Sequence, residues 1–592
     1  MKKIAIYLTT VAIILGNSSC SDFLDKEVDL SLSDEQVFSS FQNTRGFLAN
    51  IYTYLPDAFV GYTDGQYRAA SRDCMTNNAL SYWNVHYYHS VITDSYSALR
   101  HPFAQDFWPK NLRGIRAANQ FLKNARPSVI GNSDKPGDDN RLYDRNMAEA
   151  RLLRAIFHFD IAAWFGDVPV IGDDENGAPV IFDPSDTEGM NMPRTKCADA
   201  LKWIADECDA IKDKLPFRYS NENENWGRVN GAAAYALKSR ALLYRASPLN
   251  NPDNNVTYWQ EAAQATIDLI TKNQSLGNLF KLYKTADDNK NMNYYECFIT
   301  TPYYNDEYIL TRSVWNTREI EIFLSPCGFS GTVNSVGRTN PTQNLVDCYE
   351  TINGLPIDKD PAYNDQNPYD KRDRRLAQTI LHHGSIWGDR LQEEEREVDV
   401  SYPDGKDYQE LHGGTLTGYY TKKFLNNMSF KSPTNYEHAC PIFRYGEILL
   451  NAAEAVNEAY GPADAYQYVN EVRDRVGMPA YKDMTKEQLR ERIRNERRIE
   501  LCFEDHWFFD ERRWKLFEGK TPSNERDLPY YQQVYNIYGV RVTPDGSTVY
   551  NYVPAQMHTT RAFNSPKNYV FPIPDADVKK APNLKQNPGW EL

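Results

Sequence analysis

The stretch from Pro441 to Trp514 constrains the fold of this chain more than any other. Its first apolar residues recur at the spacing of one helix face, as Ile448, Leu449, Ala452 and Val456 illustrate. Gly461-Pro462 ends that helix. A second helix is predicted over about 463–476, and a third begins near Thr485, which can form a capping box with Gln488. The stretch therefore predicts two helices joined by a turn, followed by a long charged helix.

The third helix has an unusual density of charge. Within fifteen residues it carries Arg490, Arg492, Arg494, Arg497, Arg498, Glu491, Glu496, Glu500 and Glu504. One interpretation is a solvated face on which neighbours such as Arg492 with Glu496 form a lattice of ion pairs. Against it, Leu489, Ile493 and Ile499 demand burial, and a run of aromatic residues follows at once. We therefore expect several of the arginines to be paired inside the fold.

The first twenty residues read as an export signal. Lys2 and Lys3 precede an apolar run over 4–15, and small polar residues lead to Cys20. The run is too short to span a bilayer, which takes roughly 20 residues. We predict a signal peptide over 1–19 and lipidation of Cys20, although a soluble periplasmic protein is the alternative.

Length and composition point to one large ectodomain over 20–592, with residues 20–32 as a tether. The chain has 592 residues, of which 41% are hydrophobic, so it can bury a large core, and no low-complexity linker divides it. No later apolar run reaches membrane-spanning length. The formal net charge of −14 disfavours nucleic acid as a partner.

The cysteines do not suggest a disulfide framework. Nine are scattered along the chain without a CxxC pair. Cys197 and Cys208 fall in one predicted helix, roughly 16 Å apart along its axis, which is beyond disulfide reach. We expect buried free thiols.

Helical periodicity also dominates the first half of the chain. Small alanines alternate with large apolar residues, which lets neighbouring helices approach closely. Helices are predicted over about 33–55, 104–126, 141–165, 198–215, 231–246 and 258–272. Paired helices of this length resemble degenerate tetratricopeptide repeats. We predict a mainly α fold, a tetratricopeptide-like helix-pair bundle over about 33–272 and 441–514, with a loop-rich lobe over about 273–440 and 515–592.

Catalytic and metal motifs are missing from the sequence. There is no HExxH, P-loop, dinucleotide GxGxxG or GxSxG pattern. Neither His86 with His89 nor His382 with His383 has a third ligand at a usual spacing. We expect no catalytic residue, metal or cofactor. A carboxylate pair for glycoside hydrolysis stays open, because such a pair is defined by its separation in space.

Two aromatic clusters are candidates for ligand binding. The connection over 62–89 joins predicted helices yet carries Trp83, Asn84 and Tyr87 beside the polar pair Arg72 and Asp73. Flat rings and planar hydrogen-bonding groups suit the apolar faces and hydroxyls of sugars, and long connections are often binding loops. The second cluster, in the loop-rich lobe, contains Tyr304, Arg312 and Trp315. The alternative for each ring is a small core beneath a loop.

Several segments resemble one family, SusD/RagB outer-membrane nutrient-binding lipoproteins. They are SDFLDKE after Cys20, RTNPTQNLVDCYETINGLPI, NPYDKRDRRLAQTILHHGSIWG, FRYGEILLNAAEAVNE, YVNEVRDRVG, IRNERRIELCFEDHWFFDERRW and FPIPDADVKKAPNLKQNPGW. The resemblance spans nearly the whole chain. It implies four tetratricopeptide-like helix pairs with an irregular lobe packed on them.

The resemblance also implies a function. SusD-like proteins of Bacteroidetes partner SusC-like, TonB-dependent transporters, and their glycan-contacting aromatics come from an early loop and the middle of the chain. By region and order this carries over to Trp83, Asn84, Tyr304 and Trp315. We therefore expect a non-catalytic lipoprotein on the outer surface of the outer membrane that binds oligosaccharide or polysaccharide. A RagB-like peptide receptor and a surface glycoside hydrolase are the alternatives.

Overall fold

The computed structural model describes residues 33–59, 70–82, 86–100, 107–131, 142–181, 191–312, 315–410, 413–545 and 547–591. Helices hold 43% of the residues and strands 11%, so the fold is mainly α, as the sequence predicts. The helices of the scaffold are α3 (Asp34–Phe38), α4 (Phe41–Ile51), α6 (His86–Ile92), α7 (Trp108–Asn124), α8 (Pro127–Ile130), α9 (Leu142–Phe165), α10 (Cys197–Ile211), α11 (Glu222–Asn225), α12 (Gly231–Ala246), α13 (Val256–Ser275), α18 (Tyr445–Tyr460), α19 (Tyr466–Arg475), α20 (Lys486–Glu500) and α21 (Trp507–Arg513).

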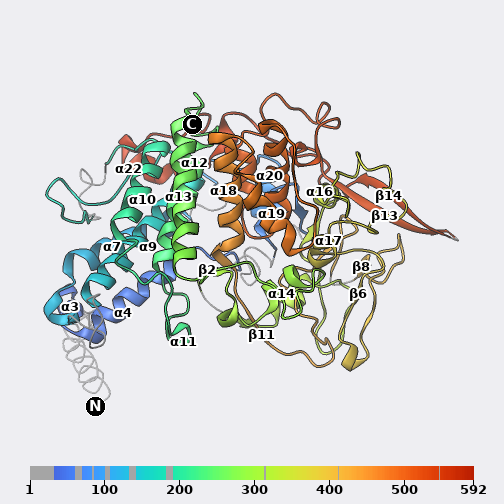
Figure 1. Cartoon of the computed structure of the whole chain (residues 1–592), viewed down its shortest axis with the longest axis horizontal. Coiled ribbons are helices and arrows are strands. Elements are labelled where there is room, and N and C mark those ends of the chain that lie inside the picture. The colour runs from blue at the N-terminus through green and yellow to red at the C-terminus, as the bar shows by residue number, and fades with distance from the viewer. Residues whose placement is uncertain are drawn as a thin grey trace, which may run out of the picture.

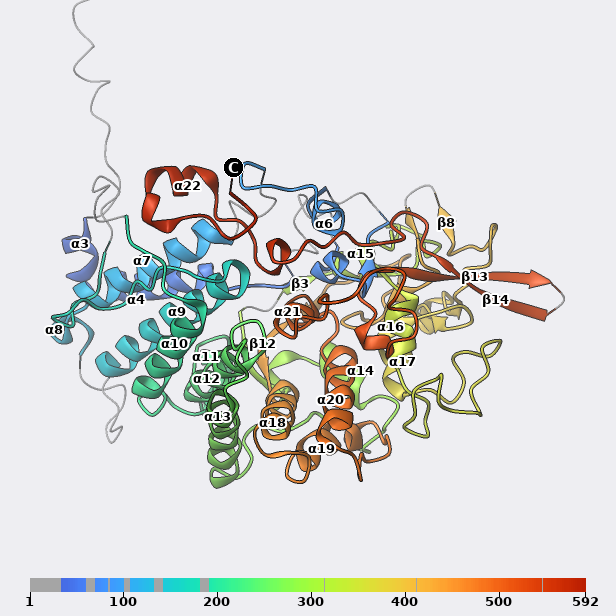
Figure 2. The ribbon, with the colours of Figure 1, turned by 90° about the horizontal axis from the view of Figure 1, so that it is seen from above.

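The long helices pack one after another in a row. α7 packs on α9, α9 on α10, α10 on α12 and α12 on α13. The next neighbour of α13 is α18, although the whole loop-rich segment separates them in sequence, and both views place the two helices side by side (Figures 1 and 2). Small residues permit this close packing: a Cβ on Gly231 would lie 2.7 Å from the carbonyl oxygen of Lys212, at the end of α10.

The predicted helix over 33–55 is wrong in one respect, because two helices occupy most of that range. α3 and α4 each begin after a serine, and the hydroxyl of Ser40 accepts a hydrogen bond from the backbone N–H of Asn43. A serine that caps a new helix competes with continuation of the preceding one. Several other predicted ends shift by a few residues, whereas α12 has the predicted bounds.

The remaining elements lie between α13 and α18 or after α21, except β1, which lies between α4 and α6. The helices are α14 (Asn293–Ile299), α15 (Glu319–Leu324), α16 (Gln343–Cys348), α17 (Arg374–Thr379) and α22 (Asp575–Lys580). The strands are β1 (Ala79–Leu80), β2 (Tyr308–Thr311), β3 (Trp315–Thr317), β4 (Asn340–Pro341), β5 (Ile380–Leu381), β6 (Ile386–Trp387), β7 (Arg396–Glu397), β8 (Gln409–Glu410), β9 (Gly413–Gly414), β10 (Tyr420–Thr421), β11 (Tyr436–His438), β12 (Pro441–Arg444), β13 (Tyr538–Asp545) and β14 (Ser547–Pro554).

The strands form antiparallel pairs, two of which attach the lobe to the scaffold. β2 pairs with β12, which runs directly into α18, and β1 pairs with β4, whereas the pair of β3 and β11 lies within the lobe. β13 and β14 form a long hairpin that projects from the end of the lobe farthest from α3 (Figure 2). One hydrophobic core includes residues from Phe38 to Trp590, so scaffold and lobe share an interior.

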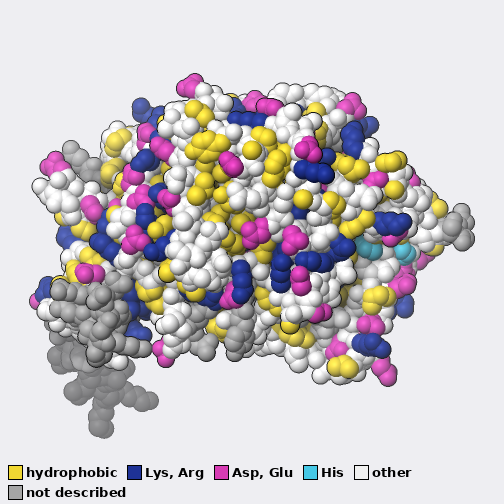
Figure 3. All heavy atoms as spheres, in the orientation of Figure 1, with side chains coloured by type: hydrophobic (Ala, Val, Ile, Leu, Met, Phe, Trp, Pro, Cys, Tyr) yellow, Lys and Arg dark blue, Asp and Glu magenta, His cyan; other side chains and the backbone are white. Residues whose placement is uncertain are grey.

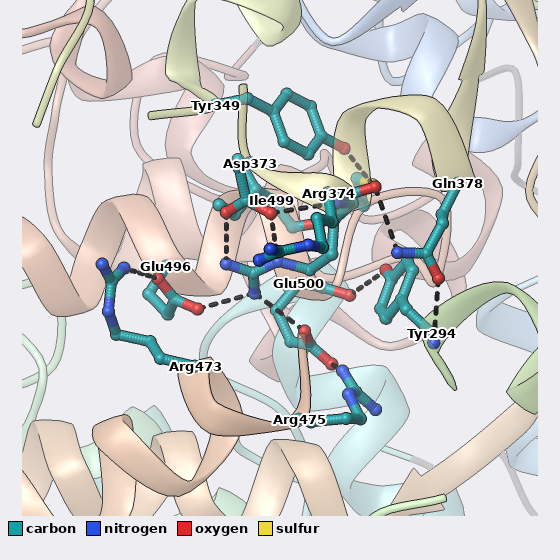
Figure 4. A network of polar contacts seen from close by, with 12 residues as sticks. Tyr294, Tyr349, Asp373, Arg374, Gln378, Arg473, Arg475, Glu496, Ile499 and Glu500 are labelled. Atoms are coloured by element: carbon teal, nitrogen blue, oxygen red, sulfur yellow. Dashed lines mark hydrogen bonds and ion pairs between the residues drawn. The ribbon is translucent and has the colours of Figure 1, made fainter. Parts of the chain in front are cut away.

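Several arginines of the charged helix α20 are ion-paired with other parts of the fold, as the sequence analysis expected: Arg490 with Glu458, Arg492 with Glu350 and Arg497 with Asp510. Thr485 and Gln488 form the predicted capping box at its start. The ion pair between Arg492 and Glu496 that a solvated helix face would allow does not form in the described structure. Arg492 pairs with Glu350 instead, and Glu496 pairs with Arg473 of α19. Glu500 binds Arg375 of α17 at 3.0 Å, Arg444 of β12 at 2.9 Å and also Arg475 of α19, and all four side chains are buried. Figure 4 shows Glu500 beside Arg475.

Two further expectations can be compared with the described residues. All eight cysteines among them are buried and unpaired, as predicted. None of the described helices is long and apolar enough to cross a membrane.

We predict that Glu500→Gln destabilises the protein by about 3–5 kcal/mol, because it leaves three buried guanidinium groups without a shared carboxylate. Chemical denaturation followed by circular dichroism measures the loss. Glu491→Gln is the matched control, since Glu491 lies on the exposed face of the same helix. Equal stability of the two variants would contradict a structural role for the buried pairs.

Acid should unfold the protein through groups such as Glu454 of α18. Burial raises the pKa of Glu454, but Arg513 at 2.6 Å, Arg497 and the Trp514 N–H together outweigh burial and lower this pKa from 4.5 to about 2. A depressed folded-state pKa stabilises the fold above the unfolded value, and this contribution is lost as pH falls from 4.5 towards 2. Free energies of unfolding measured across this range should fall less steeply in Glu454→Gln than in the wild type. Identical slopes would refute the assignment.

Candidate functional site

The predicted ligand-binding residues divide into those that the structure describes and those that it does not. Trp83, Asn84 and the lipidation residue Cys20 lie outside the described residues. The backbone of Tyr304 lies in a short turn of 3-10 helix, Pro302–Tyr304, and its side chain is outside the description. Arg72, Asp73, Tyr87, Arg312 and Trp315 are described.

Three of the described residues converge on a residue that the sequence analysis missed, Asp57. The indole N–H of Trp315 donates to Asp57 Oδ2 at 2.9 Å, and the Arg312 guanidinium donates to the same oxygen at 2.8 Å. Arg72 donates to the backbone carbonyl of Asp57 at 2.6 Å. Residues from the early and middle parts of the chain thus meet at one carboxylate. We call Asp57, Arg72, Arg312 and Trp315 the Asp57 cluster.

The strand pairs explain why these residues meet. Thr311, the last residue of β2, is opposite Pro441 of β12, and Trp315, the first residue of β3, is opposite His438 of β11. The two strand pairs hold Arg312 and Trp315 near the start of α18. Asp57 follows the short helical turn Tyr52–Tyr54 at the end of α4, and Arg72 begins another such turn, Arg72–Met75, which Ser71 caps. The cluster therefore lies at the junction of scaffold and lobe.

Further charged groups surround the cluster. Arg72 forms an ion pair with Asp505 at 2.9 Å, and Lys110 donates to the carbonyl of Leu55 at 3.1 Å. Burial, followed by repulsion from Arg312, lowers the pKa of Lys110 to about 8. Burial raises the pKa of Asp505. Asp57, Arg72 and Asp505 also line a cavity of about 90 Å³. The cluster thus combines one aromatic ring with several closely spaced hydrogen-bonding groups.

Asp73 and Tyr87 lie differently from the cluster. The side chain of Asp73 is buried and accepts hydrogen bonds from the backbone N–H of Phe503 at 2.7 Å and from Asn78 at 3.5 Å. Burial raises its pKa to about 7. Asp73 thus faces the interior, beside the chain that follows α20. Tyr87, on α6, is half-buried and packs against the core.

The aromatic residues near Tyr304 also have distinct environments. Tyr308 is buried in β2, where its hydroxyl donates to the carbonyl of Ala439 at 3.3 Å. Tyr303 instead packs edge to face against Trp226, with ring centroids 5.1 Å apart. Across the described ranges, no group of three or more His, Cys, Asp or Glu side chains is arranged to hold a metal ion.

Four of the residues described above were not predicted from the sequence: Asp57, Lys110, Asp505 and Trp226. Asp57 and Lys110 are isolated charges at or near helix ends, a common position for solvated side chains. Trp226 stands alone in the polar run NENENWGRVN, and this was the only available signal.

The chain matches family models over nearly its whole length. The model described as "SusD family" matches residues 271–590, more than half of the chain, and one described as "Starch-binding associating with outer membrane" matches residues 22–243. SusD-like protein P25 of Formosa agariphila is 22% identical over 536 residues, which cover 87% of this chain and 90% of that protein.

Solved structures have the same fold. A SusD-like protein from Bacteroides fragilis aligns with a TM-score of 0.72 and 23% identity, covering 94% of this chain and 98% of that one. A SusD-like carbohydrate binding protein from the same species aligns with a TM-score of 0.67 and 23% identity, covering 93% and 100%. By the extent of the family match, this chain belongs to the SusD family.

Proposed function

We propose that this protein is a non-catalytic, lipid-anchored protein of the cell surface, which binds oligosaccharide or polysaccharide and delivers it to a SusC-like TonB-dependent transporter. The Asp57 cluster is the observation that carries the binding part of this proposal. Its half-buried Trp315 donates its indole N–H to the Asp57 carboxylate beside the Arg312 guanidinium, so an aromatic ring and charged hydrogen-bonding groups hold fixed positions side by side. In the sequence, Trp83 and Asn84 come directly after Tyr82 and shortly before His86, the first residue of α6.

The comparisons support the ligand class. One matching family model is described as starch-binding, and one structure of the same fold is described as carbohydrate binding. Basic and acidic side chains are interspersed over the face in Figure 3, so no uniform charge of one sign covers that face.

The expected affinity is weak. Two or three rings contribute roughly 0.5–1.5 kcal/mol each beyond area burial, and each solvent-competed hydrogen bond adds about 1 kcal/mol. Association costs offset much of this gain. Dissociation constants on the order of micromolar to millimolar follow. Such affinity allows a surface protein to capture a chain and release it to a transporter.

Trp315→Ala should weaken glycan binding about three- to tenfold, because it removes a ring that contacts the apolar face of a sugar. Isothermal titration of the soluble ectodomain against neutral plant and fungal oligosaccharides measures the change. Trp315→Phe keeps a ring but loses the N–H that binds Asp57, so its affinity should lie between those of Trp315→Ala and the wild type. Tyr460→Ala, an exposed tyrosine at the end of α18, is the control.

Three results would contradict the proposal. The first is the absence of binding to any glycan by the wild type. The second is tight binding of peptides that Trp315→Ala leaves unchanged, which would favour a RagB-like peptide receptor. The third is the appearance of new reducing ends when purified protein is incubated with a glycan, which would identify a glycoside hydrolase.

The anchoring part of the proposal rests on Cys20 and on the family description that names the outer membrane. Two or more acyl chains anchor a protein stably, whereas one does so only marginally. Cys20→Ala should therefore move the protein from the outer-membrane fraction to the soluble fraction. Protease added to intact cells should degrade the wild-type protein if it faces outwards. Retention of Cys20→Ala in the membrane fraction would refute lipidation at this residue.

A further inference from the structure

A second hollow lies beside the Asp57 cluster, on the side of the scaffold. Its walls are α4, α9, α11 and the segment Trp226–Arg228, and Arg312 belongs to its lining. Its volume is about 480 Å³, within the range of small-molecule sites. Figure 1 places α11 below α4 and α9, at the lower edge of the helical scaffold. Because Arg312 also binds Asp57, the two sites share a residue.

The charge of this hollow is opposite to that of the whole chain. Arg45, Arg145, Arg228 and Arg312 line it, against two carboxylates, Glu149 and Glu224. Arg45 is exposed, and among the described residues it forms no ion pair. Arg228 lies 3.6 Å from Glu149, a loose pair. An excess of guanidinium groups in a protein with a net charge of −14 favours a ligand that carries negative charge.

Glu149 contributes a buried carboxyl group to the lining of the hollow. It is fully buried, its Oε1 accepts a hydrogen bond from the Tyr52 hydroxyl, and its Oε2 has no hydrogen-bond partner in the described part of the chain. Burial raises its pKa, while Arg228, Arg145 and Arg45 act in the opposite direction. These guanidinium groups therefore lie within electrostatic reach of the carboxyl group. A buried oxygen without a partner is costly unless a ligand group meets it.

Trp226 supplies an aromatic wall. Tyr303 holds its ring edge to face, and its indole N–H is buried without a hydrogen-bond partner among the described residues. Gly227 makes this arrangement possible: its φ is +74°, and a Cβ there would lie 3.0 Å from the carbonyl oxygen of Arg312. The loop can therefore approach the end of β2 closely, which places Trp226 and Arg228 on the wall of the hollow.

We infer that this hollow binds an anionic sugar residue, one that carries a carboxylate or a sulfate ester. Guanidinium groups would pair with the anion, Glu149 and Tyr52 would bind hydroxyls, and Trp226 would contact the apolar face of the ring. This inference rests on the proposed function and narrows its ligand to glycans with acidic units. A single glycan could place a neutral sugar residue on Trp315 and an acidic sugar residue in the hollow, because Arg312 belongs to both sites.

Titration of the full ectodomain with three probes tests the inference: oligogalacturonate, sulfated dextran oligosaccharide and neutral dextran oligosaccharide. We expect at least one anionic probe to bind about tenfold more tightly than the neutral one at low ionic strength, with a preference that salt reduces. The relative affinity of the two anionic probes distinguishes carboxylate from sulfate recognition.

Arg45→Glu should weaken binding of the anionic probe about three- to tenfold, because charge reversal at an exposed residue alters a screened interaction. Binding of the neutral probe should not change. Arg113→Glu makes the same charge change on the exposed face of α7, outside the hollow, and should have no effect on either probe. Trp226→Ala should weaken binding of the anionic probe by a similar factor.

The outcomes separate this inference from the proposed function. Binding of neutral probes without any preference for anionic ones would overturn the inference and leave the proposed function standing. The same holds if Arg45→Glu and Arg113→Glu reduce anionic binding equally, or if a polyglutamate peptide binds as tightly as the sugars. Failure of every glycan to bind would overturn both.

Discussion

The carboxylate of Glu500 is the constraint on which the rest of the structure depends. It meets three arginines, one each from α17, β12 and α19, while its own helix is α20. Each of these charges is fully buried, so each needs partners that approach with correct geometry. Four segments are therefore fixed relative to one carboxylate. We interpret the buried charges as a device for specificity of packing, because a well-packed apolar replacement is often equally stable.

The same charged interior extends to the junction of scaffold and lobe. Arg444, at the end of β12, also binds Glu307 at 2.6 Å, and Glu307 directly precedes β2. Glu307 in turn binds Arg475 of α19 at 3.0 Å. The strand pair that leads to the 312–315 connection is thus held at one end by buried ion pairs. Helix packing alone would not determine where Trp315 lies. The ion pairs of Glu307 fix the start of β2 relative to α19 and β12, and the strand register then fixes the chain that leads to the Asp57 cluster.

Sequence reasoning predicted the parts of this structure that depend on local pattern. The capping box at Thr485, the end of α18 at Gly461 and the bounds of α12 follow from helical spacing and from residues that stop helices. It also predicted that the arginines of α20 would be paired inside. It could not identify their partners, because Arg375 and Arg444 are distant in sequence and pair through tertiary packing.

In the candidate site, too, local sequence indicated some residues, whereas tertiary packing decided which of them meet. Trp315, Arg312 and Arg72 were selected because their residue types suit sugars, and the structure brings them together. Asp57, which joins them, gave no local signal, since an aspartate after a helix is usually solvated. Asp73 was selected with Arg72 as a polar partner from the early connection, yet in the turn at 72–75 its carboxylate accepts a hydrogen bond from the backbone N–H of Phe503. Adjacent residues in a tight turn face different environments, and sequence alone does not reveal which one faces the surface.

Asp57 bears on affinity as well as on position. Ordering a side chain at an interface costs about 0.5–1.5 kcal/mol, which is comparable to what one aromatic ring contributes beyond its buried area. Asp57 holds both Trp315 and Arg312 through hydrogen bonds within the protein, so under the proposed function little of this cost remains to be met on binding. In a site whose individual contacts are weak, that preorganisation determines whether the contacts give a net affinity. Asp57, which gave no sequence signal, is thus the residue that positions Trp315 and Arg312 in the proposed site.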